Sequence, residues 1–418
     1  MNSRSSLLTT LAATTLVAAA ALTTHAQTWV TVLDSAHGGI AGSSSDIGSD
    51  AAGNVFAVGS TRQTTDGIMR AVVLGSGDQG TTWSVLDQYA EPGLNYVHHR
   101  AVAANSLTGS LLAGGNLNNL LPDGSYEFDT LWFIRERNPV TGTWSTADDY
   151  SVLANDIGQA SCADLLVTPS GDAYATGGSA LGAGPGFLVR KRPAGASAFT
   201  TVDADYSRQT AGAGWDLCFH PSYGVFAVGE VKGIWTVRRS STGNQGTWAT
   251  VDSFYTPREW TSGSAKCIFA SSSKIHVVGS AYNASTRKTH WVVRSSADGG
   301  LTWSITDMAV TGVNVEARGI VEDAAGNLLV CGQIAGAAGD MHWIVRKGTP
   351  GTQLVKQGGK WVTIATMTWT TSDDFQLAAG KSAQPNAITT AAGITYVSGY
   401  AQDANGVNQW IVRKLPAQ

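Results

Sequence analysis

A short strand pattern ending in glycine recurs seven times along the chain, and this repeat constrains the fold more than any other feature. The copies read VFAVG, LLAGG, AYATG, VFAVG, IHVVG, LLVCG and TYVSG, with their last glycines at Gly59, Gly115, Gly177, Gly229, Gly279, Gly332 and Gly399. Successive glycines are 50 to 67 residues apart. Self-similarity at such a period indicates an array of equivalent supersecondary units.

Each glycine strand lies among three further predicted strands. A short apolar segment precedes it, an alternating strand such as HWVVRSS or QWIVRKL follows it, and a last strand most often begins with tryptophan. Alternation of apolar and polar residues is typical of half-buried β-strands. After QWIVRKLPAQ the chain ends without a last strand, whereas TWVTVLDS near the N-terminus is similar to the last strand LTWSITDM.

These patterns predict an all-β fold, a single seven-bladed β-propeller of four-stranded blades over residues 27–418. The N-terminal strand of the mature chain would complete the last blade, so that no long sheet edge stays bare. The alternative is an open stack of sheets, which would expose hydrophobic end faces. The 49 glycines agree with many tight turns.

The first 26 residues predict export. They contain one cation, Arg4, an apolar run from Leu7 to Leu22 and small residues up to Ala26, the pattern of a signal peptide cleaved near Ala26. We therefore expect a secreted, periplasmic or extracellular protein. With a net charge of −4 and no basic stripe, nucleic acid is not an expected partner, and no second segment is long enough for membrane insertion.

Two turns share the pattern Ser-x-Asp-x-Gly-x-x-Trp. One contains Ser76, Asp78, Gly80 and Trp83, and the other contains Ser296, Asp298, Gly300 and Trp303. The pattern resembles the Asp-box of sialidase-like, or BNR, propellers, and ARGIVEDAAGNLLVCG is similar to the SBBP-type repeats of exported bacterial proteins. The resemblance implies a propeller fold with the Asp-boxes away from the active face. The Arg-Ile-Pro motif of sialidases is missing, so sialidase activity is not expected.

Tryptophan separates repeat positions from candidate site positions. Eleven of the fourteen tryptophans fall in the third or fourth strands, and Trp361 is assigned to the start of a fourth strand. The other three, Trp215, Trp260 and Trp369, fall in predicted connections between repeats, and we expect them on one face. Exposed indoles there could stack on sugar rings; alternatively, they fill gaps between blades.

Polar candidates accompany these tryptophans. The segment before Trp260 supplies Tyr255, Arg258 and Glu259. At the heads of the first strands lie Asp46, Arg100, Asp164, Asp216, Lys266, Arg318 and Asn386. Around a channel mouth these charges would either pair with one another or hold an anionic ligand, and Arg100 and Arg318 are the candidate partners of a bound saccharide.

The favoured hypothesis is a monomeric protein that binds a carbohydrate or cell-surface polymer on its loop face. A polysaccharide-degrading enzyme, either a glycoside hydrolase of sialidase-like type or a lyase, is the alternative, and it needs two carboxylates or a Tyr or His base. Segments of those types contain Asp123, Glu127, Asp129, Asp373, Asp374, Glu91, Tyr96, His98 and His99. A protein-interaction scaffold is the third hypothesis.

No spacing typical of a metal site is present, and neither a metal nor another cofactor is expected. The cysteines are Cys162, Cys218, Cys267 and Cys331. They fit either buried free thiols or one disulfide between Cys218 and Cys267.

Overall fold

The computed structural model describes residues 28–35, 39–119, 121, 131–150, 160–178, 186–205, 212–308, 311–312, 314–358 and 360–417. These residues form 29 β-strands joined by turns. The predicted signal peptide lies outside the described residues. Among them, no helix is long and apolar enough to cross a membrane.

The strands succeed one another as antiparallel groups of four, which we number I to VII. Group I contains β2 (Gly39–Ser49), β3 (Val55–Gln63), β4 (Met69–Ser76) and β5 (Ser84–Tyr89); group II contains β6 (Tyr96–Ala104), β7 (Leu111–Asn118), β8 (Leu131–Arg137) and β9 (Trp144–Tyr150). Group III contains β10 (Ser161–Val167), β11 (Ala173–Gly178), β12 (Phe187–Arg192) and β13 (Thr200–Asp205); group IV contains β14 (Gly212–His220), β15 (Gly224–Val231), β16 (Ile234–Ser240) and β17 (Ala249–Ser253).

The remaining groups follow the same plan. Group V contains β18 (Trp260–Ala270), β19 (Ile275–Asn283), β20 (Lys288–Ser296) and β21 (Ser304–Asp307), with the short β22 (Thr311–Gly312) also on β20. Group VI contains β23 (Glu316–Glu322), β24 (Leu328–Ala335), β25 (Met341–Gln357) and β26 (Lys360–Phe375). Group VII contains β27 (Ala383–Ala391), β28 (Ile394–Gln402) and β29 (Asn408–Leu415), and its outer strand is β1 (Val30–Ser35), which pairs with β29.

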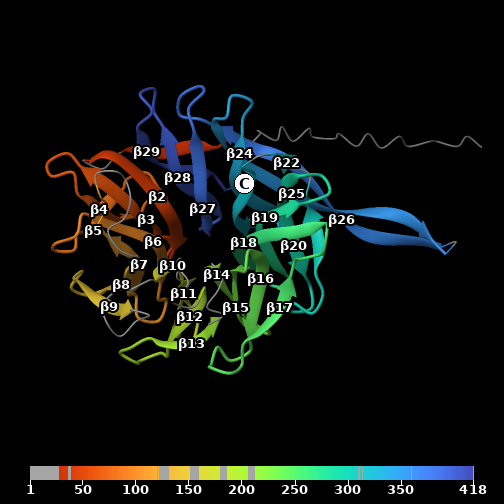
Figure 1. The fold of residues 1–418 in the computed structure, drawn as a ribbon, viewed down its shortest axis with the longest axis horizontal. Helices are drawn as coiled ribbons and strands as arrows, with labels where there is room; N and C mark the ends of the chain where they lie inside the picture. Colours follow the sequence, from red (N-terminus) through yellow and green to blue (C-terminus); the bar gives the residue numbers. More distant parts are fainter. Residues whose placement is uncertain are drawn as a thin grey trace, which may run out of the picture.

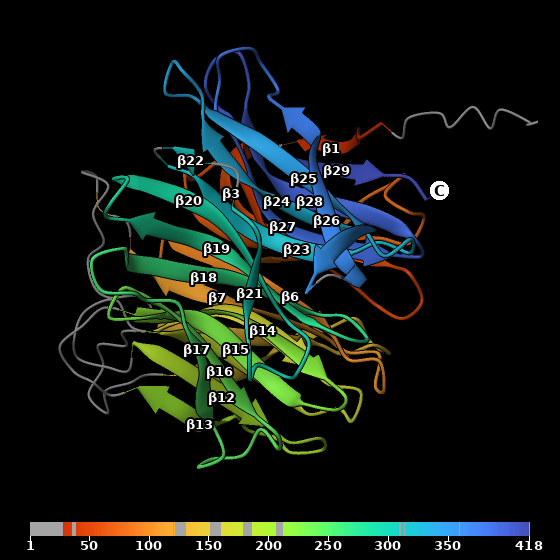
Figure 2. The ribbon, with the colours of Figure 1, turned by 90° about the vertical axis from the view of Figure 1, so that its right-hand side faces the viewer.

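By hydrogen bonding the strands form six sheets, because groups I and II count as one eight-stranded sheet. A single parallel bridge between Met69 and Tyr96 joins these two groups. The first strands contact one another in order, from β2 to β6 and onward to β27, and β27 contacts β2. Figure 1 shows the groups arranged around a common centre, and Figure 2 shows them from the side. The architecture is that of a β-propeller.

The repeated glycines permit a close approach of two backbones. A Cβ atom on Gly229 would lie 1.9 Å from the carbonyl oxygen of Ala213, and one on Gly279 would lie 2.0 Å from that of Ser264. The other five repeated glycines face a first-strand carbonyl oxygen in the same way, within 2.2 Å. Only glycine tolerates this contact.

Beside each of these glycines the first strand contains a β-bulge. Each of these bulges leaves one residue out of the ladder: Ser45, Arg100, Ala163, Trp215, Lys266, Arg318 and Asn386. A bulge frees its extra residue from pairing and re-aims that side chain. The glycine repeat therefore marks the places where side chains can turn toward the centre.

The Val-Arg motif of the third strands ties neighbouring groups together. Its arginine binds an aspartate in the last strand of the preceding group, in the pairs Arg135–Asp87, Arg190–Asp148, Arg238–Asp203, Arg294–Asp252, Arg346–Asp307 and Arg413–Asp373. Five of these guanidinium groups also lie over an aromatic ring, that of Tyr89, Tyr150, Phe254, Trp369 or Phe375. The recurring Tyr89 and Tyr150 thus belong to the contacts between groups.

The junction between groups VII and I replaces this ion pair with two leucines. Leu33 faces Val412 across the ladder, as Asp373 faces Val345 in group VI, and Leu74 stands at the arginine position of group I. Both leucines belong to one hydrophobic cluster that also contains Tyr396 and Trp410. Both partners have changed together, so neither leaves a buried charge unpaired.

Strands β25 and β26 extend far beyond their group and form the arm that projects in Figure 1. Trp361 does stand at the start of the fourth strand β26, as predicted, but it does not occupy the packing position of the other fourth-strand tryptophans. Trp361 lies near the end of the arm with 69% of its surface exposed, whereas the indole of Trp369 donates to the carbonyl of Thr306, as Trp144 donates to Leu86. Because the arm adds residues to the start of β26, the packing tryptophan comes later in the sequence than the repeat spacing predicts.

The two Ser-x-Asp-x-Gly turns share one hydrogen-bond pattern. Ser76 donates to Asp78, and the amide of Gly80 donates to Ser76. Hydrogen bonds from the Thr82 hydroxyl and amide, with that from Ser76, lower the pKa of Asp78 to about 2. Asp298 is held in the same way, so both acids stabilise turns.

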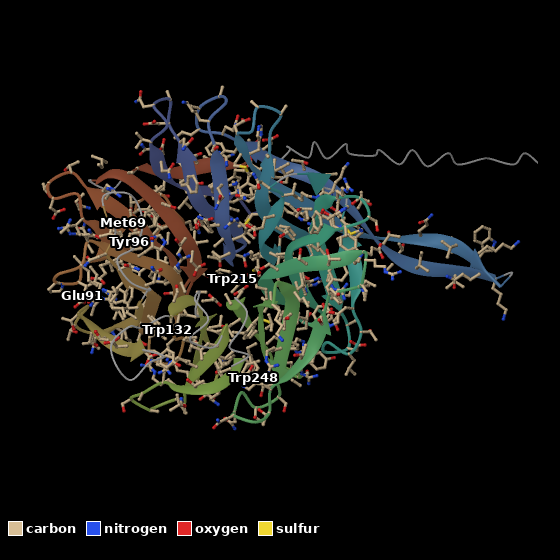
Figure 3. All side chains as sticks on the ribbon, viewed as in Figure 1. Met69, Glu91, Tyr96, Trp132, Trp215 and Trp248 are labelled. Carbon is tan, nitrogen blue, oxygen red and sulfur yellow. The ribbon has the colours of Figure 1, made fainter. Side chains whose placement is uncertain are left out.

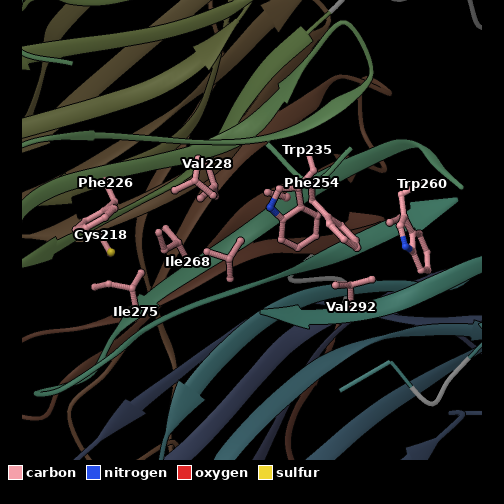
Figure 4. Packing of buried hydrophobic residues seen from close by; sticks show 13 residues of the cluster. Cys218, Phe226, Val228, Trp235, Phe254, Trp260, Ile268, Ile275 and Val292 are labelled. Carbon is pink, nitrogen blue, oxygen red and sulfur yellow. The ribbon is translucent and has the colours of Figure 1, made fainter. Parts of the chain in front are cut away.

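The hydrophobic core lies between the groups. Figure 4 shows one cluster between groups IV and V, in which Trp235, Phe254 and Trp260 pack together. The third-strand tryptophans Trp132, Trp235, Trp291, Trp343 and Trp410 are fully buried. All four cysteines are free, and Cys218 packs in the same cluster as Trp260.

Candidate functional site

The seven bulges meet around a cavity of about 300 Å³ at the centre of the groups, which we call the central cavity. All seven residues listed from the heads of the first strands line it. The sequence spacing was one residue off in three groups: Asp46, Asp164 and Asp216 follow the bulged residue, whereas Arg100, Lys266, Arg318 and Asn386 are the bulged residues themselves.

In the central cavity, cations and acids therefore occupy different positions of the first strands. The bulged residues supply three cations, and the residues directly after the bulges supply three acids. The lining continues along the later part of the first strands, through Ile268, Phe269, Val321 and Thr390, and includes no residue before a bulge. The cavity thus extends from the bulges toward the turns between first and second strands, on the side of groups V to VII.

The three acids connect neighbouring groups. Asp46 accepts hydrogen bonds from the amides of Ile47 (2.7 Å) and Val102 (2.8 Å). Asp216 does the same with Leu217 (2.8 Å) and Ile268 (2.7 Å). Asp164 also accepts from Leu217, at 2.9 Å. In each case an amide of the next group donates, so these carboxyl groups hold the first strands together.

Burial makes the acids weak. It raises the pKa of Asp46 to about 7, although the two amide hydrogen bonds oppose the shift. Burial also raises the pKa of Asp164 well above its usual range, helped by the charge of Asp216 and a hydrogen bond to it. The Asp216 pKa is raised by burial as well. In all three acids burial thus favours the protonated form more than it does in an exposed aspartate.

The cations are only partly neutralised. Glu316 lies 2.6 Å from Arg318 and 3.5 Å from Lys266, so two cations share one carboxylate. Arg100 donates from Nε to the amide oxygen of Asn116. Among the described residues, no ion pair joins the three cavity acids to these cations, so an anionic or strongly polar ligand could still bind them.

Two buried donors in this region lack acceptors. Among the described residues, neither Nε1 of Trp215 nor Nε of Arg318 has a hydrogen-bond partner. Buried donors are rarely left without a partner in folded proteins. The Trp215 ring already carries the ammonium group of Lys266 at 4.0 Å from its centroid. A ligand that accepts hydrogen bonds would satisfy both donors.

The three candidate tryptophans do not form one cluster, contrary to the prediction. Trp215 lies in β14 and lines the central cavity, as Figure 3 indicates near the centre of the molecule. Trp260 begins β18, is 7% exposed and packs between Phe254 and His290. Trp369 lies in the outer strand β26. Trp215 and Trp260 lie in strands because the first strands β14 and β18 begin earlier in the sequence than the repeat spacing predicts. Trp369 lies in a strand because the arm lengthens β26.

The other candidates divide between two places. Arg100 and Arg318 line the central cavity with Trp215. Tyr255, Arg258 and Glu259 are exposed in the turn before β18 and are not part of its lining. The turn closes by hydrogen bonds from Glu259 to Thr256 and from Thr256 to Trp260.

The candidates for catalysis have structural partners where they are described. Asp123, Glu127 and Asp129 lie outside the described residues. Asp373 binds Arg413, and Asp374 contacts His342.

Of the histidines in the Tyr96–Arg100 segment, His99 is buried and His98 is half-buried. The ring of His98 bridges the hydroxyls of Ser45 and Ser60, at 2.6 Å each. Burial holds the pKa of His98 well below its ordinary value and lowers that of His99 to about 3. Within the described part of the chain, no group of three or more His, Cys, Asp or Glu could hold a metal ion.

Solved structures support the propeller fold. An ancestral GH74 enzyme superposes with a TM-score of 0.55 at 12% identity, over 91% of this chain and 49% of its own. The endosialidase of phage phi92 superposes with a TM-score of 0.51 at 10% identity, over 94% of this chain and 69% of its own. The chain thus spans about half the length of the GH74 enzyme. No family model matches the sequence, and no curated protein matches it significantly.

Proposed function

We propose that the mature protein is an exported, monomeric seven-bladed propeller that binds a carbohydrate or cell-surface polymer in its central cavity. Counting groups I and II as two blades agrees with their single bridging pair and with the contacts from β2 around to β27. The pairing of β1 with β29 supports closure by the N-terminal strand. The turn geometry at Asp78 and Asp298 supports the resemblance to Asp-box propellers.

One observation carries the binding proposal: an indole and three cations meet in a single cavity, and two of these four groups, Trp215 and Arg318, have a buried donor without a partner. Trp215 supplies an apolar ring, and Arg100, Lys266 and Arg318 supply donors around it. Saccharides combine apolar ring faces with hydroxyls, and acidic saccharides add a carboxylate. Because the three cavity acids accept backbone amides and do not pair with these cations, acidic saccharides are favoured. Two structural neighbours with a TM-score above 0.5, a GH74 enzyme and an endosialidase, are carbohydrate-active enzymes by name.

Binding is favoured over cleavage because the cavity acids are already engaged. Asp46, Asp164 and Asp216 all accept backbone hydrogen bonds within or between first strands. A glycosidase needs one free carboxylate and one proton-donating acid that both face the scissile bond. The raised pKa of Asp164, which lies beside Asp216, keeps cleavage as the second candidate.

A glycan array followed by calorimetric titration tests binding. The mature protein should bind at least one acidic oligosaccharide, and Trp215→Leu should weaken binding at least about tenfold. Trp260→Leu is the matched control: it removes a buried indole outside the cavity, so it should lower the melting temperature and leave affinity unchanged. Equal affinity of the wild type and the Trp215 variant would refute the cavity as the site.

Mass spectrometry separates binding from degradation. After incubation with acidic and neutral polysaccharides, the binding proposal expects intact polymer. New oligosaccharides would instead establish an enzyme, with an unsaturated end indicating a lyase and a saturated end a hydrolase. A protein that neither binds nor cleaves any glycan would support the scaffold hypothesis.

A further inference from the structure

A second cavity, of about 510 Å³, lies between groups I and II at the ends of strands β4 and β8. Its walls include the apolar side chains of Phe56, Leu86 and Leu111, and Arg137 lies in its lining. Asp50 also lines it, but that carboxylate accepts hydrogen bonds from the amides of Ala52 and Asn54 in its own turn. We call it the junction cavity.

Arg137 has no acidic partner. Its Nε is buried without a hydrogen bond, and the guanidinium forms no ion pair with any residue that the structure describes. A buried guanidinium atom without an acceptor is costly, because the donor loses its water. The apolar walls around it increase that cost.

The next junction shows what Arg137 lacks. Arg192 occupies the same position at the end of β12, and it binds Glu136 of the preceding group through two hydrogen bonds, of 2.7 and 3.1 Å. For Arg137 the equivalent position in the preceding group is Gly75, which stands one residue from the end of β4 and lines the junction cavity. The repeat retains the arginine and omits its carboxylate.

Gly75 has no side chain, and the space beside its Cα is already occupied. A Cβ atom there would lie 2.7 Å from Cδ1 of Leu86, so the apolar wall fills the space that a side chain would need. The position left for a carboxylate is therefore in the cavity. Its volume is within the range of small-molecule sites.

We propose that the junction cavity binds a small amphipathic carboxylate. The carboxylate of the ligand pairs with Arg137 in the two-pronged geometry that Glu136 adopts on Arg192, and an aryl or alkyl body lies against Phe56, Leu86 and Leu111. The site is separate from the central cavity and independent of the carbohydrate proposal.

Ligand-observed NMR titration with 4-phenylbutyrate tests the proposal. The wild type should bind it saturably, and the uncharged 4-phenylbutyramide should bind at least about tenfold more weakly. Arg137→Gln should weaken phenylbutyrate binding at least about tenfold, and Arg137→Lys should lose part of the affinity because it retains the charge without the fork.

Arg192→Gln is the matched control, since it removes the same residue type at the same position of the next group. It should cost stability through unpaired Glu136 but leave phenylbutyrate binding unchanged, as should Trp215→Leu. Absence of saturable binding by the folded wild type would overturn the proposal. Equal binding of acid and amide, or unchanged binding by folded Arg137→Gln, would overturn it as well.

Discussion

At the scale of single residues, the repeated glycines and the bulges beside them place the central cavity. Each glycine lets a first-strand carbonyl approach its Cα, and the first strand then bulges by one residue. The bulged side chains leave the ladder and line the cavity, as Trp215 and Lys266 do. A feature that identified the fold therefore also positions the candidate site.

Replacing Gly229 with alanine tests this role. Its Cβ would lie 1.9 Å from a backbone oxygen and 2.9 Å from the Phe187 ring, so we expect destabilisation of about 3 kcal/mol. Gly351 in the arm has no backbone atom within that range and is the control; Gly351→Ala should change stability by less than about 0.5 kcal/mol. Chemical denaturation measures both. Similar small effects would mean that the close approach is not required.

The raised pKa of Asp46 predicts a pH dependence of stability. Because the folded state binds the proton more tightly than the unfolded chain, stability falls as the pH rises from about 4 to about 7. Asp46→Asn should make the decrease in stability with pH shallower. Part of the decrease should remain, because the pKa values of Asp164 and Asp216 are raised as well.

Urea denaturation across this interval measures the slope. Asp66→Asn is the control, because the pKa of surface Asp66 is lowered by its hydrogen bonds to Arg70 and acts only below about pH 4. An Asp46→Asn slope equal to that of the wild type would contradict the assignment.

At the scale of elements, the third strand of one group contacts the last strand of the preceding group through either an ion pair or two apolar side chains. Six junctions have a buried or half-buried Arg–Asp pair, often under an aromatic ring, and the seventh has Leu33 and Leu74. Removing one member of a buried ion pair is costly, whereas replacing both with apolar residues can be neutral. The leucine junction shows that this fold accommodates the apolar version.

A double-mutant cycle at Arg294 and Asp252 tests that equivalence. Arg294→Leu alone should cost about 3 kcal/mol because it leaves Asp252 buried and unpaired, and Asp252→Leu should be similar. The double variant should be more stable than either single variant, with a coupling of about 2 kcal/mol. Additive losses would show that the two charges do not depend on each other.

At the scale of the whole molecule, the sequence predicted the order of the strands and the residues around the central cavity, because both follow from a regular repeat. It failed where the repeat is interrupted. The arm moved the packing tryptophan of the fourth strand from Trp361 to Trp369, and Trp260 proved to be a packing residue. Arg137 was missed because its signal is the absence of a carboxylate at Gly75, which requires knowing which strands are neighbours.

A crystal structure of the mature protein with an acidic oligosaccharide from the glycan array tests the central claim most directly. We predict the sugar in the central cavity, against Trp215 and within hydrogen-bond distance of Arg318, with β1 completing the seventh blade of the same molecule. A sugar bound instead at the exposed turn of Tyr255 and Arg258, or a β1 strand paired with another molecule, would contradict the account.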